Sequence, residues 1–485
     1  MNTANEKLKK IPIHLKTNPE YLIPRHQFIQ AIENFFYHHK NKLVYVHISM
    51  FILFLSFTVI PVFLPTPLES DTVFDNFTLF SQFLLWGIWF PFVFASVIFT
   101  GRSWCGILCP MGAASEWANK IGFKRNIPGW LKWEGTPILS FLLITILGQT
   151  IDVRDQADAI LEIFGGTLML ALLIGFFYGK NKRAWCRHVC PIGLLLGVFS
   201  RMGIVQFAPK HPREKGNPYT EKGVCPTMIA ISRKDESRHC IQCFRCVKPS
   251  SPGGLFVRLR KIGHEIIHIR DYNPNLAEIW FIFLGTGVAL GGFLWLILPE
   301  YQILRQAIGT WFIEHEWYWI GESGSRFLMS VHPEARQTYN WLDFMMITGF
   351  MAFCMLLVTA VLSACTLLSS FIVRQFTQDK NIKIYFTELG YQFTPVAMLS
   401  IIIGLGDKLF TELHHCGVAE SLLASIKATL LAGSILWSIH LGRSMLQRQN
   451  IHGIRQGIAL LPGIAGSLFI GFAWWPAIFG MHFLF

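Results

Sequence analysis

Apolar segments long enough to cross a lipid bilayer recur along the 485-residue chain, and this feature constrains the fold most strongly. A transmembrane helix needs about 20 mostly apolar residues. Nine segments approach that length, at roughly 43–65, 79–100, 136–151, 160–178, 276–298, 341–373, 388–405, 421–441 and 457–484. Charged residues make up 15% of the chain, whereas soluble domains contain about 25%. The sequence therefore predicts an all-α polytopic membrane protein with about nine transmembrane helices, and it excludes a soluble enzyme and a disordered chain.

Loop charges predict which side of the membrane each loop faces. The segment before the first span is Lys-rich, whereas the next loop contains Glu69, Asp71 and Asp75 and no base. The alternation continues, and residues 180–270 contain 18 Lys and Arg against 5 Asp and Glu. By the positive-inside rule, the N-terminus and the basic loops are cytoplasmic in a bacterial inner membrane. The net charge of +12 then reflects topology, so membrane lipid is an expected partner and nucleic acid is not.

A repeat with an offset of 81 residues relates two parts of the N-terminal half. Each copy is a two-span hairpin that ends in the pattern W-C-x3-C-P-x-G, so the copies are related by parallel symmetry. The matched residues are Arg102, Trp104, Cys105, Cys109, Pro110, Gly112 and Gly122 in the first copy, and Arg183, Trp185, Cys186, Cys190, Pro191, Gly193 and Gly203 in the second.

Eight of the eleven cysteines fall in the two loops predicted to be cytoplasmic, and the other three are Cys354, Cys365 and Cys416. A reducing compartment disfavours structural disulfides. Four thiolates are what a [4Fe-4S] cluster or a structural zinc ion needs. We therefore predict two quartets that each bind a [4Fe-4S] cluster, formed by Cys105, Cys109, Cys186 and Cys190 and by Cys225, Cys240, Cys243 and Cys246.

The second quartet follows from a broken ferredoxin pattern. The run Cys240-x2-Cys243-x2-Cys246 supplies the first three ligands of the bacterial ferredoxin motif, whose fourth position is occupied here by Ser250. Cys225, which precedes Pro226, is the available replacement.

The same cysteines also fit a zinc site or a different division between two clusters. C-x2-C pairs also occur in zinc ribbons, although three cysteines at this spacing suit a cubane better than one tetrahedral ion. Ligands could also be exchanged between neighbouring clusters. Basic residues beside the cysteines would offset thiolate charge and help to set the reduction potential, and topology alone explains them equally well; they are Arg187, Arg238, Arg245 and Lys248.

The paired cysteine motifs and the ferredoxin-like loop resemble the membrane polyferredoxin family over about residues 40–275. That family includes quinol-linked components of periplasmic nitrate reduction, accessory proteins of nitrous-oxide reductase and of cytochrome oxidase assembly, and ferredoxins that accompany bacterial iron-permease uptake systems. The loop R-H-C-I-Q-C-F-R-C-V-K-P and the tail beginning F-L-G-T-G-V-A-L-G-G resemble the iron-uptake branch most. Other branches generally carry two complete ferredoxin motifs, and this chain departs from them at Ser250.

We predict four regions on this basis. They are a cytoplasmic N-terminal arm (1–42), a four-span repeat core (43–205), a cytoplasmic ferredoxin-like region (206–275) and a five-span membrane extension (276–485).

Several residues outside the cysteine loops are also candidates. His414, His415 and Cys416 could bind iron or copper and form a periplasmic electron exit, or they could belong to an ordinary polar interface. Intramembrane histidines could ligate haem or serve structural hydrogen bonds; these are His47, His440 and His482. Aromatic residues in the loop 299–340 fit an interfacial belt or a docking surface; they are Trp311, Trp317, Tyr318 and Trp319. Lys427 and Asp343 fit snorkelling or capping roles near span edges.

The favoured function is electron transfer, as a component of a redox system rather than as a stand-alone enzyme. The protein would pass electrons between a cytoplasmic donor or the quinone pool and a periplasmic redox or iron-uptake protein, or a membrane iron permease. A hydrocarbon core of about 30 Å is long for a single electron step, so an intermediate such as quinone, haem or flavin is implied.

The resemblance favours support of iron uptake. The alternative is electron transfer to, or maturation of, a periplasmic nitrate or nitrous-oxide reductase, or copper-oxidase assembly. A zinc-stabilised assembly factor is less favoured. A transporter is less favoured as well, because the spans offer almost no opposed charges.

Overall fold

The computed structural model describes residues 27–68, 70–209, 223–249, 254–333 and 337–479. Within these residues, eight segments are helical, long and apolar enough to cross a membrane, which confirms a multi-pass membrane protein. They are Leu43–Phe63, Phe77–Thr100, Ala157–Phe177, Leu276–Ile297, Trp341–Phe376, Ile382–Leu405, Glu420–Arg448 and Gly453–Phe479. The segment expected at 136–151 is the shorter helix α6 (Thr136–Thr150). Its 15 residues rise about 22 Å, less than the roughly 30 Å of a hydrocarbon core.

The N-terminal half repeats one arrangement, in which a long apolar helix leads into a cysteine loop and then a short helix. The short helix α5 packs against α7, and its counterpart α9 packs against α6. The elements are α2 (Leu43–Val59), α3 (Phe77–Gln82), the π-helical segment Phe83–Trp89, α4 (Phe90–Thr100), the π-helical turn Trp104–Leu108, α5 (Pro110–Ile121), α7 (Ala157–Phe177), α8 (Ala184–His188) and α9 (Pro191–Phe199).

The region between the repeat and the extension contains little regular structure. Strands β1 (Val205–Pro209) and β2 (Leu255–Leu259) pair antiparallel, with Val205 opposite Leu259. Helix α1 (Gln27–His39) packs onto this strand pair. Helix α10 (His264–Ile267) follows β2 in the chain. The ring of Phe36 stacks on Phe244 with centroids 4.0 Å apart, so α1 covers the loop that contains the cysteine run.

The C-terminal half is a bundle in which α11 packs closely on α13. A β-carbon at Gly287 would lie 2.7 Å from Met355 Cα, and one at Gly291 would lie 2.9 Å from Cys354 Cβ. Small residues four apart permit this close approach of two membrane helices. The elements are α11 (Leu276–Ile297), α12 (Pro299–Glu314), β3 (Val331–His332), β4 (Gln337–Thr338), α13 (Trp341–Phe376), α14 (Ile382–Gly390), α15 (Thr394–Leu405), α16 (Asp407–His415), α17 (Glu420–Arg448), α18 (Gly453–Ala473) and α19 (Trp475–Phe479).

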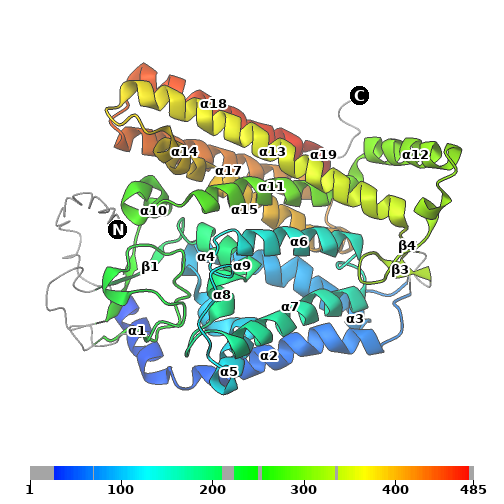
Figure 1. The fold of residues 1–485 in the computed structure, drawn as a ribbon, viewed down its shortest axis with the longest axis horizontal. Helices are drawn as coiled ribbons and strands as arrows, with labels where there is room; N and C mark the ends of the chain where they lie inside the picture. Colours follow the sequence, from blue (N-terminus) through cyan, green and yellow to red (C-terminus); the bar gives the residue numbers. More distant parts are fainter. Residues whose placement is uncertain (1–26, 69, 210–222, 250–253, 334–336, 480–485) are drawn as a thin grey trace, which may run out of the picture.

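Figure 1 shows the helices of the repeat below those of the C-terminal half, with β3 and β4 at the opposite end of the molecule from β1. Helix α12 lies in the stretch 299–340 that the sequence analysis treated as a loop, and Pro299 occupies its first turn. Short 3₁₀ turns complete the described structure at Ile60–Phe63, Ile231–Arg233, Ile269–Tyr272, Tyr318–Gly321 and Tyr391–Phe393.

Candidate iron-sulfur centre

Each copy of the repeat places its second cysteine at the start of a helix. Cys109 is the N-cap of α5 and Cys190 is the N-cap of α9. Proline follows both, because the first turn of a helix does not need that N–H group. The Gly112 N–H donates to Cys109 Sγ at 3.4 Å, and the Gly193 N–H donates to Cys190 Sγ at 3.3 Å. The two copies therefore fold their motif in the same way.

The structure brings the four cysteines of the repeat together. Burial, together with the neighbouring Cys105, raises the pKa of the Cys109 thiol to about 11. Burial also raises the pKa of Cys190 well above its usual value, with added effects from Cys186, Cys109 and Cys105. The four thiols are thus buried and close enough to influence one another. We refer to them as the first quartet.

The second quartet gathers around a sharply bent loop. Gln242 and Phe244 have φ angles of 51° and 59°, a left-handed conformation that is uncommon for residues other than glycine. The Gln242 side chain donates from Nε2 to the Val205 carbonyl at 3.2 Å and holds the first bend. Burial raises the pKa of Cys246, and Cys240, Cys243 and Cys225 raise it further. Cys225 therefore lies beside the cysteine run, although 15 residues separate it from Cys240.

The two quartets share an interface. A β-carbon at Gly106 would lie 2.1 Å from the Ile241 carbonyl oxygen and 2.8 Å from the Cys243 amide nitrogen. The backbone that follows Cys105 is therefore packed directly against the backbone of the cysteine run. This contact could not be predicted from the sequence, because nothing in the two local cysteine patterns relates one to the other.

Two buried arginines, Arg102 and Arg183, occupy equivalent positions in the repeat, and Arg183 reaches from the second copy to the first. Arg183 Nε lies 2.7 Å from Glu116, and Arg183 Nη1 donates to the Cys105 carbonyl at 3.0 Å. Arg102 donates from Nη1 to the Arg238 carbonyl, and its Nη2 lies 3.9 Å from Cys105 Sγ. Both arginines belong to the repeat alignment, but the sequence does not show which residues they contact, because those partners lie in other segments of the chain.

The residues present fit an anionic iron-sulfur cluster in each quartet. Each quartet contains four buried or half-buried cysteines, and guanidinium groups stand beside them to offset thiolate charge. The buried atoms Arg102 Nε and Arg183 Nη2 have no hydrogen-bond partner in the described part of the chain. Among the described residues, no three His, Cys, Asp or Glu side chains are placed to hold a single metal ion.

A cavity of about 240 Å³ extends from the first quartet into the helix bundle. Its walls are mainly apolar and aromatic. On α6 the lining residues run from Phe141 to Gln149, eight residues that correspond to about 12 Å along the helix. Arg154 lies at the far end, in the turn between α6 and α7. The other ring residues of the wall include Trp86, Trp89, Phe90, Phe94 and Phe164.

Charged residues, half-buried or exposed, lie near the far end of this cavity. Burial lowers the pKa of Arg154, while Asp407, Asp155 and Asp152 oppose that effect. Burial, together with the neighbouring Asp155, raises the pKa of Asp152 to about 6. The Asp152 Oδ2 atom has no hydrogen-bond partner in the described part of the chain. An acidic turn with a single Arg was visible in the sequence, but its position below a cavity was not.

A smaller cavity of about 80 Å³ reaches Cys186 and Cys190 from another direction. Lys132, Arg187 and Arg238 contribute to its lining, together with Glu134. Arg245, by contrast, pairs with Glu116 at 2.5 Å, so it belongs to the contact between the quartets.

The remaining candidates lie apart from the quartets. His415 Nδ1 is 3.6 Å from Glu412, and His414 Nδ1 is 3.2 Å from the Val418 carbonyl, at the exposed end of α16. Cys416 is exposed. His47 is buried, with Nε2 3.2 Å from the Gly106 carbonyl, so it borders the first cysteine loop rather than an axial ligand site. His440 is exposed, and His482 and Ser250 lie outside the described residues.

The other polar and sulfur candidates have ordinary partners. Lys427 Nζ lies 3.1 Å from Asp407, and Asp343 caps α13 and pairs with Arg305 at 2.5 Å. Cys354 is buried between helices and Cys365 is half-buried. The four aromatic residues near α12 are exposed, with fractions between 48% and 65%, namely Trp311, Trp317, Tyr318 and Trp319.

A family model described as a 4Fe-4S binding domain matches residues 82–128 and 161–210, one match for each copy of the repeat. These two segments are therefore similar to known 4Fe-4S binding domains. Both matched segments contain a Cys-x3-Cys-Pro motif, and the second quartet lies outside them.

Known relatives match about a third of the chain. An uncharacterized protein of Methanocaldococcus jannaschii, MJ0749, is 27% identical over 163 residues, which cover 32% of this chain and 63% of that protein. The ferredoxin-type protein NapH of Escherichia coli is 27% identical over 167 residues, covering 30% of this chain and 58% of NapH. The regulatory protein NosR of Stutzerimonas stutzeri is 27% identical over 191 residues, covering 33% of this chain and 25% of NosR. No solved structure is significantly similar to the chain.

Proposed function

We propose that this protein is a membrane electron-transfer component in which the two quartets each hold a [4Fe-4S] cluster. The observation that carries the proposal is the packing of the two four-thiol groups against each other through Gly106. Such clusters accept and release single electrons. The protein's part is to exclude water from the thiols, to place Arg102 and Arg183 beside them, and to keep the quartets adjacent.

The 240 Å³ cavity supports a second element of the proposal, a site for a lipid-soluble quinone. Aromatic walls favour a planar apolar ring, and Arg154 and Gln149 offer N–H donors to a carbonyl oxygen at the far end. None of the described lining residues is a histidine, so the usual haem ligand is missing there. A carrier in this cavity would shorten the electron path across a core of about 30 Å.

We infer that the acceptor is a respiratory reductase system on the side opposite the quartets, with the clusters on the cytoplasmic side as loop charge predicts. The likeness to the ferredoxin-type protein NapH and to the regulatory protein NosR supports the respiratory alternative over iron uptake. Support for iron uptake comes from the sequence of the ferredoxin-like loop and the tail alone. His414, His415 and Cys416 add nothing to it, since they are exposed and make only local contacts.

Growth of a deletion strain separates the two pathways. The strain is complemented with the wild type or with Cys240→Ser and grown on nitrate or nitrous oxide, and separately on limiting iron. We expect the deletion and Cys240→Ser to lose respiratory growth while growing normally on limiting iron. Normal respiration with failure on limiting iron would overturn the assignment and favour the iron-uptake branch.

A further inference from the structure

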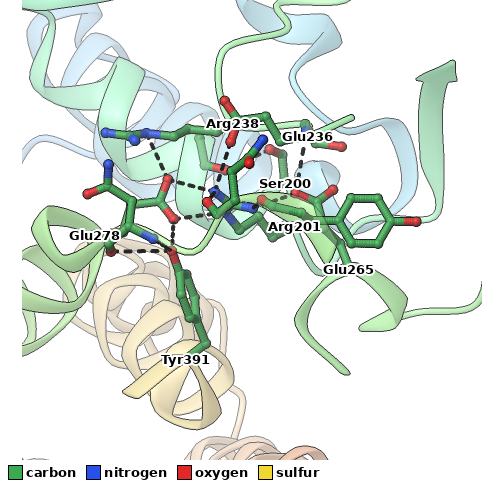
Figure 2. A network of polar contacts seen from close by, with 12 residues as sticks. Ser200, Arg201, Glu236, Arg238, Glu265, Glu278 and Tyr391 are labelled. Carbon is green, nitrogen blue, oxygen red and sulfur yellow. Dashed lines mark hydrogen bonds and ion pairs between the residues drawn. The ribbon is translucent and has the colours of Figure 1, made fainter. Parts of the chain in front are cut away.

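A buried group of paired charges joins the cysteine-bearing region to the C-terminal bundle (Figure 2). Arg201, just after α9, is fully buried, with 2.8 Å contacts from Nε to Glu278 and from Nη1 to Glu265. Glu278 lies in the first turn of α11, and the Tyr391 hydroxyl donates a hydrogen bond to it. The C-terminal bundle thus supplies a carboxylate and a hydroxyl group to the region around the quartets.

The charges at the centre of this group balance. Arg201, Arg238 and Arg260 face Glu236, Glu265 and Glu278, with Arg260 bound to Glu265 and Glu236 3.3 Å from Arg201. At the edge of the group, the exposed Glu134 lies 3.6 Å from Arg238 Nη1. Buried ions are tolerated when each has a partner. The group therefore creates little net field of its own and acts mainly by fixing positions.

One branch of the group leads to the first quartet. Glu278 holds Arg238 through an ion pair at 2.8 Å to Nε. The Arg238 carbonyl in turn accepts a hydrogen bond from Arg102 Nη1. Arg102 Nη2 lies 3.9 Å from Cys105 Sγ. A carboxylate of α11 is therefore connected through two arginines to a thiol of the first quartet.

The two repeat arginines differ in how their charge is compensated. Arg183 pairs with Glu116 of the first copy. The position equivalent to Glu116 in the second copy is Gly197. A β-carbon at Gly197 would lie 2.8 Å from the Arg238 carbonyl oxygen and 3.5 Å from Arg102 Nη1. The glycine thus makes room for a neutral carbonyl where the first copy has a carboxylate.

Among the described residues, no carboxylate lies within ion-pair distance of Arg102. Its guanidinium remains a buried cation whose charge faces the first quartet. A nearby positive charge stabilises the more negative, reduced form of a cluster, so net charge is one of the factors that set its potential.

We propose that Arg102 sets the reduction potential of the cluster in the first quartet, and that Glu278 is the positioning residue that holds Arg102 through the Arg238 carbonyl. This inference rests on the proposed function, since it requires a cluster in the first quartet. It gives the C-terminal bundle a role in the electron chemistry that does not depend on binding any partner.

The test is a redox titration of the anaerobically purified full chain, monitored by electron paramagnetic resonance. We expect Arg102→Gln to lower the potential of one cluster by about 59 mV, which is tenfold in the equilibrium constant of a one-electron step. Arg102→Lys keeps the positive charge, so it should reverse at least half of the lowering seen in Arg102→Gln. Iron and sulfide contents are measured on every variant.

A double-mutant cycle separates the positioning role of Glu278 from a direct field effect. If Glu278 acts through Arg102, Glu278→Gln should shift the potential of the same cluster in the wild type and by less than half as much in the Arg102→Gln background. Equal shifts in both backgrounds would overturn the positioning role. Glu236→Gln is the matched control, because it removes a carboxylate of the same group whose ion pair is with Arg201 rather than with Arg238.

The outcomes distinguish this inference from the proposed function. Protein without iron and sulfide would contradict the proposed function itself. Wild-type iron content with an unmoved potential in Arg102→Gln would overturn the inference alone. If Arg102→Gln does not accumulate, Glu278→Gln and Glu236→Gln are compared alone. A shift confined to Glu278→Gln supports the inference, and equal shifts refute it.

Discussion

Gly106 lies against the backbone of Cys243, with room for no side chain between them: a β-carbon at Gly106 would sit 2.8 Å from the Cys243 amide nitrogen. Gly106 follows Cys105 of the first quartet, and Cys243 belongs to the second. The separation of the quartets is therefore set by the absence of one methyl group. This contact couples the repeat to a loop that the repeat symmetry does not include.

Gly106→Ala should push the cysteine run away from the repeat, because backbone cannot yield as a flexible side chain does. We expect weaker magnetic interaction between the two reduced clusters and a lower content of the second cluster. Electron paramagnetic resonance of fully reduced protein measures the first effect, and iron analysis measures the second. Gly129→Ala is the control, since a β-carbon there would meet nothing within 4 Å. Spectra of Gly106→Ala identical to the wild type would show that the quartets do not depend on this contact.

Anaerobically purified protein should contain about eight iron and eight sulfide ions per chain and little zinc, because two complete quartets are present. Metal analysis and a visible spectrum check this. Stoichiometric zinc without sulfide would end the cluster assignment and favour the zinc-stabilised alternative.

Cys225→Ser should remove about half of the iron, because Cys225 is predicted to complete the second quartet. Ser250→Ala, at the vacant ferredoxin position, should leave the iron content unchanged. Equal iron in Cys225→Ser and in the wild type would instead point to a different fourth ligand, and a loss confined to Ser250→Ala would point to a serine ligand.

Local sequence patterns were enough to predict most of the long helices and the relation between the two cysteine motifs of the repeat. Hydropathy predicted the long helices because a bilayer leaves few alternatives to a helix of apolar residues. Cys109 and Cys190 were predictable as a related pair, since each stands before a Pro and three residues before a Gly that donates to its sulfur. Helix α12 was missed because its mixed composition lacks a span-length apolar run.

Relations between distant segments could not be predicted in the same way. Glu116 and Gly197 were visible as a mismatch between the two copies, but only their packing shows that one faces Arg183 and the other Arg102. The cavity is a gap between helices of both halves, and no residue pattern reports such a gap. Arg154 stood out as a lone base in an acidic loop, and the structure adds the cavity that it borders.

Stability should depend on pH through Asp152. Its pKa of about 6 lies above its usual value, so the folded state binds more protons than the unfolded state between about pH 4 and 6. The free energy of unfolding therefore falls as pH rises through that window. The loss should be on the order of 2 kcal/mol. Asp152→Asn should remove this pH-dependent loss, and Asn tolerates the positive φ of 57° at this position.

Thermal unfolding at pH 5 and pH 7.5 measures the effect. The exposed Asp75→Asn serves as the control, and an unchanged pH profile in Asp152→Asn would contradict the assignment.

Arg154→Gln tests the cavity as a quinone site. A hydrogen bond from a charged group to a ligand contributes about 1.5–3 kcal/mol, so we expect KM for a soluble quinol analogue to rise roughly tenfold or more. Cluster absorbance and iron content should stay unchanged, because Arg154 lies at the end of the cavity away from the cysteines. Arg154→Lys keeps the positive charge near Asp152, Asp155 and Asp407 and should lose less affinity.

Arg326→Gln is the control, since Arg326 is exposed and pairs with Asp158 rather than lining the cavity. Rapid-mixing measurement of cluster reduction by the quinol separates the cases. Equal rates in the wild type and Arg154→Gln at all quinol concentrations would place quinol binding elsewhere, and equal losses in Arg154→Gln and Arg326→Gln would attribute the effect to surface charge.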